Sequence, residues 1–328
     1  MSGDKNAASG DKILEENDMR VAAGLIIAIS LCVPGIAWSQ SAPAQTAAAP
    51  QAAPAPAEQP RQPARAPCTN PNALGVARTV EIDTTGGPGF GFEHFKELDF
   101  LKDKEVVLTF DDGPWEKNTE MVLKALADEC TTGIFFEIGK HATYYPEIAK
   151  KVYAAGHPIG THTWSHANLN DKKLNDDQRK EEVEKGISAV KWALGGISPS
   201  SFFRFPALQH PPEMVTYLGQ RNIAIFSCDV DSFDFKYHDP KKVMALIFKG
   251  LGKYGKGIIL MHDFHKETAA LLPEVLTRLK TEGYKVVAMR SKVPVQSLPQ
   301  YDEALIKEAK LPTLTQRPVS SVVTDVAN

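Results

Sequence analysis

The chain has 328 residues, of which 43% are hydrophobic, and a formal net charge of −3 at pH 7. This length and apolar content allow the chain to bury a full core. Its 37 basic residues are spread along the chain rather than clustered, so we expect no nucleic-acid partner.

Residues 1–39 are typical of an export signal preceded by an N-terminal extension. Arg20 comes before the apolar run VAAGLIIAISLCV, which is too short to span a bilayer comfortably, and AWS at 37–39 resembles a small-x-small cleavage site before Gln40. We therefore predict an exported protein of the periplasm or cell envelope, with no membrane span in its mature form.

Three alternatives concern this N-terminal segment. Met19 is a possible true start, because residues 1–18 are polar and unusually long for the region before an apolar run. Cys32 raises the possibility of a lipoprotein signal, but Leu31 before it is not the small residue that such a signal prefers. An uncleaved membrane anchor is the second interpretation of the whole segment.

Residues 40–67 consist largely of Ala, Pro and Gln and carry hardly any large apolar side chain. Such a composition cannot bury enough surface to offset the entropy lost on ordering. We predict a disordered linker, which serves either as a tether between an envelope surface and the folded domain or simply as a passive spacer.

The cysteines suggest where folding begins, near Cys68. Without Cys32 the mature chain keeps three cysteines, an odd number that in an oxidising compartment indicates one disulfide and one buried thiol. Cys228 lies in the apolar run IAIFSC and is the predicted thiol. The hypothetical disulfide then joins Cys68 and Cys130.

The segment 68–293 is predicted to be one folded domain of the α/β class. From residue 105 onward, short β-rich runs alternate with helical patterns. The expected strands lie at 105–110, 132–138, 157–161, 201–205, 223–228, 257–261 and 284–288. Seven β/α units predict a parallel sheet closed into a barrel; an open doubly wound sheet is the alternative, although no GxGxxG follows the first strand. Residues 294–328 are expected to form a partly ordered tail.

The residues able to do chemistry follow these strands on one side of the predicted sheet. The first strand ends in Asp111 and Asp112, and GP after them is a turn signal. Later strands are followed by His162 and His166, by Arg204, by Asp229, Asp231 and Asp234, and by His262 with Asp263. Since the carboxyl ends of parallel strands share one edge, we expect these side chains over one mouth.

The sequence HTWSH places two imidazoles, His162 and His166, four residues apart after a strand. A tight loop or helical turn can aim both at one point. With a carboxylate from Asp111 or Asp112 they would supply two nitrogens and one oxygen, leaving positions open for water and substrate. This set of donors predicts a metal site of the catalytic type.

The motifs TFDDGP, HTWSH, the Arg of FFRFP, DSFDF and ILMHD, in this order, resemble the five motifs of the polysaccharide deacetylases, the NodB-homology carbohydrate esterases. The resemblance covers about residues 104–290. It implies a distorted (β/α)7 barrel as a single catalytic domain, a divalent metal that is usually zinc, and hydrolysis of N-acetyl groups from amino-sugar polymers. The implied partner is a polysaccharide or oligosaccharide containing N-acetylglucosamine, and we expect a monomer.

Carried over by position, the resemblance implies a role for each motif. The metal ligands would be Asp112, His162 and His166. Asp111 would be the general base and His262 the general acid. Arg204 would orient and tune Asp111, and Asp231 would do the same for His262. Substrate contacts would come from the backbone near Ala207, from Phe235 and from Leu260, while Asp229 and Asp234 are given no role.

Two motifs depart from the family pattern. The third motif normally continues from its Pro into Tyr and Gly, but here Ala207 and Leu208 follow Pro206. The fourth normally ends in Trp, and here Phe235 stands in its place. Both departures concern the shape of the substrate groove rather than the metal, so peptidoglycan, a chito-oligosaccharide and an exopolysaccharide all remain open as substrates.

Two other functional classes are compatible with part of this pattern. One is a noncatalytic glycan-binding protein that kept the barrel and lost turnover, which the presence of every proposed ligand, acid and base disfavours. The other is a two-His, one-carboxylate iron oxygenase, which leaves Arg204, Asp231 and His262 unexplained. The remaining histidines are expected to be surface or supporting groups: His94, His141, His157, His210, His238 and His265.

Overall fold

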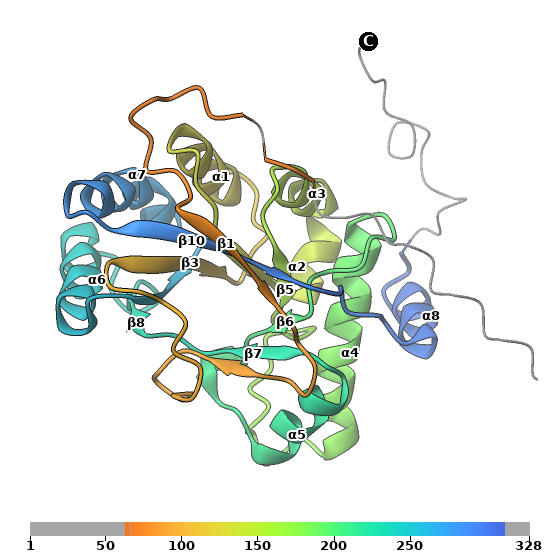
Figure 1. Ribbon diagram of the computed structural model, residues 1–328. Coiled ribbons are helices and arrows are strands. Elements are labelled where there is room, and N and C mark those ends of the chain that lie inside the picture. Colours follow the sequence, from red (N-terminus) through yellow and green to blue (C-terminus); the bar gives the residue numbers. More distant parts are fainter. Residues whose placement is uncertain (1–62, 66, 312–328) are drawn as a thin grey trace, which may run out of the picture. The chain divides into compact units, whose positions relative to one another are not determined.

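The protein is described by a computed structural model, in which residues 63–65 and 67–311 are placed well enough to describe. A sheet of parallel strands runs through this part of the chain, with helices packed around it (Figure 1). All seven predicted strands are present: β3 (Glu105–Asp111), β4 (Ile134–Glu137), β5 (Ile159–Thr161), β6 (Phe202–Phe203), β7 (Ala224–Phe226), β9 (Gly257–His262) and β10 (Lys285–Ser291). Three short strands were not predicted: β1 (Arg78–Ile82), β2 (Gly89–Phe90) and β8 (Val230–Asp231).

The strand order confirms the α/β prediction of a distorted barrel. The order is β1-β10-β3-β4-β5-β6-β7-β2, with β9 on the other side of β3 and β8 beside β9. Strand β3 is central because it pairs with β10 at its start, with β4 at its end, and with β9 along its length. The sheet curls into a barrel. Among the described strands no ladder joins β7 to β8, so the barrel is open at this point.

The helices follow the strands as the alternating pattern predicts. They are α1 (Asn118–Asp128), α2 (Gly139–Tyr144), α3 (Pro146–Ala154), α4 (Asp176–Ala193), α5 (Pro212–Gln220), α6 (Pro240–Tyr254), α7 (Lys266–Thr281) and α8 (Pro299–Glu308). Local chemistry sets several of their ends. Asn175 caps α4 in a capping box with Gln178, and Asp239 caps α6, which stops at the left-handed Gly255.

The two faces of β3 contribute to different cores. Val107 packs with Phe136 and Phe226 in the interior of the barrel, whereas Leu108 and Phe110 pack on the opposite face with residues of α1 and α7. Burial on both faces explains why the strand is a continuous apolar run. Each such side chain contributes roughly 1.5–3 kcal/mol of burial free energy, which holds the strand end that carries the site.

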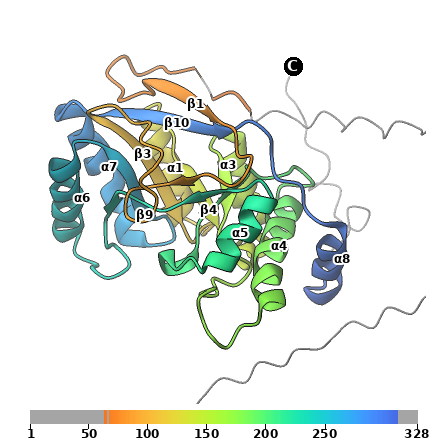
Figure 2. The same cartoon turned by 60° about the horizontal axis from the view of Figure 1, so that its bottom comes forward.

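The predicted disulfide is confirmed, since Cys68 and Cys130 are bonded with their Cα atoms 5.5 Å apart. Cys228 is the buried free thiol, also as predicted, and burial raises its pKa. Within the predicted tail, α8 lies beside α4, and Lys191 binds Asp302 at 2.9 Å (Figure 2).

The predicted export signal and almost all of the predicted linker lie outside the described residues. Within residues 63–65 and 67–311, no helix is long and apolar enough to cross a membrane.

Candidate active site

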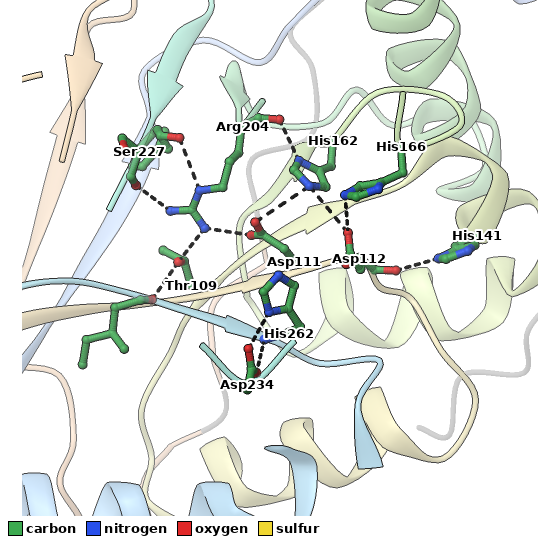
Figure 3. A network of polar contacts seen from close by, with 12 residues as sticks. Thr109, Asp111, Asp112, His141, His162, His166, Arg204, Ser227, Asp234 and His262 are labelled. Carbon is green, nitrogen blue, oxygen red and sulfur yellow. Dashed lines mark hydrogen bonds and ion pairs between the residues drawn. The ribbon is translucent and has the colours of Figure 1, made fainter. Parts of the chain in front are cut away.

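The register of the sheet brings the predicted residues to one edge. Asp111 lies opposite His262 on β9 and opposite Phe136 on β4, and Thr161 lies opposite Phe203. Strands β3, β5, β6 and β9 therefore end at one level, and the next residues along the chain include Asp112, His162 and Arg204. Figure 3 shows these side chains converging. The prediction of one shared rim is confirmed for these residues but was wrong for Asp229, whose carboxylate accepts the backbone N–H of Ile258 at 2.6 Å, at the opposite end of β9 from His262.

Asp112, His162 and His166 come together as a candidate metal site. The Nε2 atoms of His162 and His166 lie 3.5 Å and 3.3 Å from Oδ1 of Asp112, respectively. Ligands of a tetrahedral ion with bonds of about 2.1 Å lie at about this separation. Oδ1 of Asp112 is buried and accepts no hydrogen bond within the described part of the chain. A buried carboxylate oxygen without a donor fits a site that a cation would complete.

The ring of His162 is oriented for metal binding. Its Nδ1–H donates to the main-chain oxygen of Arg204 at 2.7 Å, which leaves Nε2 with a free lone pair toward Asp112. Burial lowers the pKa of His162, although Asp111 and Asp112 oppose the shift, so the ring is neutral and able to ligate. His141 supports the ligand Asp112, because its Nδ1–H donates to the main-chain oxygen of Asp112 at 2.6 Å.

The ligand loops carry unusual backbone conformations. Asp112, Thr163 and His166 have φ values of 72°, 65° and 61°, in the left-handed region that side chains with a Cβ rarely adopt. Such conformations persist only where surrounding contacts hold them, and they concentrate at functional sites. The turns re-aim side chains that a regular strand would point elsewhere.

Arg204 is fully buried and holds Asp111, as predicted. Its Nη1 donates to Oδ1 of Asp111 at 2.7 Å and to the hydroxyl of Thr109 at 2.7 Å, and Nη2 donates to the main-chain oxygen of Ser227 at 2.8 Å. The guanidinium also lies 4.5 Å from the ring centre of Phe136. A buried pair is stable only with such additional hydrogen bonds, and here they fix the direction of the carboxylate.

The predicted partner of His262 was wrong, because Asp234 rather than Asp231 holds it. Nδ1–H of His262 donates to Oδ1 of Asp234 at 2.6 Å, and the backbone N–H of His262 donates to Oδ2 at 2.8 Å. Thr268 donates to the same Oδ2 at 2.7 Å. Asp231 instead accepts the backbone N–H of Phe233 at 2.7 Å. Phe233 has a φ of 53°, and this turn directs the second carboxylate of DSFDF, not the first, toward the ring.

The charges on this pair are strongly coupled. Burial alone would lower the pKa of His262, but the charge and hydrogen bond of Asp234 raise it to about 10. Burial acts to raise the pKa of Asp234, but the charge and hydrogen bond of His262 outweigh it and hold this pKa below its ordinary value. Asp231 is only half-buried, and burial raises its pKa to about 6. The imidazolium is therefore the form of His262 present near neutral pH.

The three predicted substrate contacts lie around the mouth. Leu260 is two residues before His262 on β9, so its buried side chain is on the same face of the strand. The ring of Phe235 is half-exposed and meets the ring of His262 edge-on, with the centroids 5.8 Å apart. Ala207 is exposed in the short 3₁₀ helix η1 (Pro206–Leu208) with a φ of 53°. The assignment of substrate contacts to these residues remains a prediction.

Two further buried carboxyl groups flank the site: Asp263, which was expected at this rim without an assigned role, and Glu137, which was not predicted. Asp263 follows His262 and accepts a short hydrogen bond from Thr119, while its Oδ1 has no partner among the described residues. Burial raises the pKa of Asp263 to about 7. Glu137 ends β4, is fully buried, and has no hydrogen bond to either carboxylate oxygen in the described part of the chain.

One of the remaining histidines was also assigned wrongly. His157 is not a surface group but a buried one, packed against Phe135 and hydrogen-bonded to Thr132 at 3.0 Å. Burial lowers its pKa to about 3, so it is a neutral residue of the core. The feature of the sequence that could have indicated this burial was the position of His157 at the start of a predicted strand.

The chain is similar to known deacetylases. The sequence model of the family described as polysaccharide deacetylase matches residues 100–225. The chain is 32% identical to a peptidoglycan-N-acetylglucosamine deacetylase of Listeria monocytogenes, over 57% of this chain and 38% of the relative. It is also 32% identical to a chitooligosaccharide deacetylase of Azorhizobium caulinodans, over 48% of this chain and 73% of the relative. The match thus covers well under half of the Listeria protein.

A solved structure shares the fold. A peptidoglycan deacetylase of Bdellovibrio bacteriovorus superposes with a TM-score of 0.60 at 29% identity, covering 71% of this chain and 64% of that one. The family match ends at residue 225, before Asp234 and His262, so the hydrogen bond between them is an independent observation of this structure.

Proposed function

The chain belongs to the polysaccharide deacetylase family, and on that premise we propose that it hydrolyses N-acetyl groups of an amino-sugar polymer. One observation carries the proposal. A carboxylate held by a buried guanidinium and an imidazolium held by a buried carboxylate lie beside Asp112, His162 and His166 (Figure 3). This is the arrangement that amide hydrolysis requires, with a base, an acid and an electrophile around one point.

Asp112, His162 and His166 would hold a divalent metal, for which we propose zinc. Two imidazole nitrogens and one carboxylate oxygen are donors that suit this ion, and three protein ligands are typical of its catalytic sites. When bound, such an ion polarises the amide carbonyl and acidifies a water molecule.

Asp111 would act as the general base. Oδ1 is engaged by Arg204, and Oδ2 lies 3.9 Å from Nε2 of the ligand His162. The carboxylate therefore has one fixed oxygen and one that faces the ligand set. From there it can accept the proton of the attacking water, and Arg204 compensates its charge before the reaction.

His262 would act as the general acid. Its Nδ1 is bound to Asp234, so the other ring nitrogen carries the proton to be donated. In Figure 3 the ring lies between Asp234 and the carboxylates of Asp111 and Asp112. With a pKa of about 10, it is protonated at neutral pH and can protonate the leaving amine as the C–N bond breaks.

The substrate we propose is N-acetylglucosamine in peptidoglycan, with chito-oligosaccharides and exopolysaccharides as alternatives. Two of the relatives described above act on peptidoglycan and one on chitooligosaccharides, as their names state. The disulfide between Cys68 and Cys130 supports export, since such bonds persist in oxidising compartments. The half-exposed Phe235 offers an aromatic surface where the family usually has Trp.

The test is acetate release from peptidoglycan and chito-oligosaccharides by the purified full chain with zinc added. We expect Asp111→Asn to reduce release by roughly 10²–10⁴-fold, the usual contribution of a general base. The matched control Asp128→Asn, at an exposed helix position, should leave the rate unchanged. Wild-type protein that binds zinc but releases no acetate from either polymer would contradict the proposal. Metal analysis that finds iron would favour an oxygenase instead.

A further inference from the structure

A second group of metal-binding side chains lies beside His262. His238, His265 and Glu267 each offer one ligand atom, and these atoms lie within 4.8 Å of one another. The group shares no residue with Asp112, His162 and His166. Its donors are two imidazole nitrogens and one carboxylate oxygen, the same kinds as in the first group.

The ends of two helices bring these side chains together. His238 directly precedes Asp239, the capping residue of α6, and His265 is the capping residue of α7, with Glu267 in its first turn. The rings of His238 and His265 lie 5.6 Å apart at an angle of 69°. The ring of Phe264 packs against that of His265 at 4.0 Å and limits its rotation.

The three side chains are available to a ligand. His238 and Glu267 are exposed and His265 is half-buried. Within the described residues, none of the three side chains forms a hydrogen bond, whereas His141, His157, His162, His210 and His262 each use a ring nitrogen in one. Burial lowers the pKa of His265, and the neighbouring His262 and His238 lower it further, although Asp234 and Asp112 oppose this.

We propose that His238, His265 and Glu267 form a second site for a divalent cation of the zinc type. Two imidazole nitrogens and a carboxylate oxygen favour zinc over magnesium or calcium, which prefer oxygen donors alone. The side chains of His238 and Glu267 are exposed, so changes of rotamer can bring their ligand atoms close enough to bind one ion. Three ligands leave coordination positions open, as in the first site.

A cation in this second site would affect turnover because of its position. This part of the inference rests on the proposed function. The ring of His265 lies 5.9 Å from that of His262, the residue that would donate a proton to the leaving amine. A hydrated cation bound there would stand beside the place of the leaving group and obstruct it. Zinc in excess of the first site should therefore inhibit the enzyme.

The test is the number of zinc ions bound by the full chain in equilibrium dialysis against zinc alone. We expect two ions for the wild type and one for His238→Gln or for Glu267→Gln. His166→Gln should retain the second ion, and the double variant with His238→Gln should bind none. His210→Gln, a half-buried histidine outside both groups, is the matched control and should bind two. If His238→Gln and Glu267→Gln bind as much zinc as the wild type, the second site does not exist.

Acetate release then separates this inference from the proposed function. At stoichiometric zinc, His238→Gln should match the wild type. The zinc concentration that halves the rate should be at least about tenfold higher for the variant, since even the loss of a partner outside the ligand set weakens metal binding by about this factor. If the wild type releases acetate but binds a single zinc ion even in excess zinc, only the second site is overturned. Two ions bound by a protein that releases no acetate would overturn only the proposed function.

Discussion

Two buried carboxyl groups end neighbouring strands and have opposite surroundings. Asp111 ends β3 on the face that carries Thr109, and Arg204 donates to it at 2.7 Å. Glu137 ends β4 on the face that carries Phe135, with no hydrogen bond among the described residues. Burial and the nearby carboxyl group of Asp263 raise the pKa of Glu137 well above its ordinary value.

This comparison shows that the partner, not the depth of burial, decides what a carboxyl group can do. Both side chains are almost inaccessible to water. A buried carboxyl group without a partner stays protonated because ionisation there is costly, whereas a fixed cation offsets that cost. Asp111 can therefore accept a proton from the attacking water. Glu137 instead lowers the free energy of unfolding as the pH rises.

The largest expected effect comes from removing the partner of Asp111. Arg204→Gln leaves a buried carboxylate without its cation, so we expect a loss of about 3–5 kcal/mol in the free energy of unfolding, measured by urea denaturation. Acetate release should fall as well. The control Arg179→Gln removes an arginine whose ion-pair partners are exposed, and should cost at most about 1 kcal/mol. Equal losses for the two variants would contradict the role of Arg204.

The next effect distinguishes the two carboxylates of DSFDF. His262 must be protonated to act as an acid, and its raised pKa of about 10 keeps it so to alkaline pH. Asp234→Asn removes the charge that raises this pKa, so the alkaline limb of the activity profile should move down by at least about one pH unit.

Asp231→Asn is the matched control for that change. It should leave the alkaline limb in place, because Asp231 binds the backbone of Phe233 and not the ring of His262. A shift caused by Asp231→Asn but not by Asp234→Asn would restore the original assignment from sequence.

A third prediction concerns the carboxyl group without a partner. Unfolded Glu137 ionises near pH 4.3, whereas the folded group does so at a much higher pH, so its contribution to the free energy of unfolding becomes more unfavourable as the pH rises above about 4.3. Glu137→Leu should therefore stabilise the protein by roughly 1–3 kcal/mol at pH 8 and by less at pH 4.5. Thermal denaturation at both values checks this, and destabilisation at pH 8 would show a hidden partner for Glu137.

The smallest effect is expected at an ion pair far from any chemistry. Arg78 binds Glu105 at 2.6 Å, and this hydrogen bond is the main cause that lowers the pKa of Glu105 to about 2. The stabilisation is present above the unfolded pKa of about 4.3 and is lost as the pH falls through 2.

Because the Arg78 side chain is partly exposed, Glu105→Gln should cost only about 1 kcal/mol at pH 7. The loss should vanish near pH 2 in urea denaturation. Acetate release at pH 7 should not change, since the pair lies at the opposite end of β3 from Asp111.

Residues that follow long apolar runs could be predicted from the sequence. Strands β3 and β9 are recognisable without tertiary information, and a parallel register alone then brings Asp111 and His262 together. The ligand motif HTWSH is similarly local. The disulfide followed from counting cysteines, once Cys228 was assigned to the core.

Residues positioned by irregular backbone could not be predicted. The choice between Asp231 and Asp234 depends on a left-handed turn at Phe233, which the sequence does not reveal. Strands β2 and β8 have two residues each, too few for a periodic pattern. The second histidine group depends on where two helices begin, which varies by a residue or two in any sequence-based assignment.

The disulfide has a mechanical consequence. When a force is applied through the chain before Cys68, the covalent bond passes the load directly to Cys130 after α1. Strand β1 follows Cys68 and is held to β10 by backbone hydrogen bonds and by the ion pair between Glu81 and Arg290, and the disulfide shields it from the load. The domain can thus bear a force from its N-terminal side without its edge strand being peeled away.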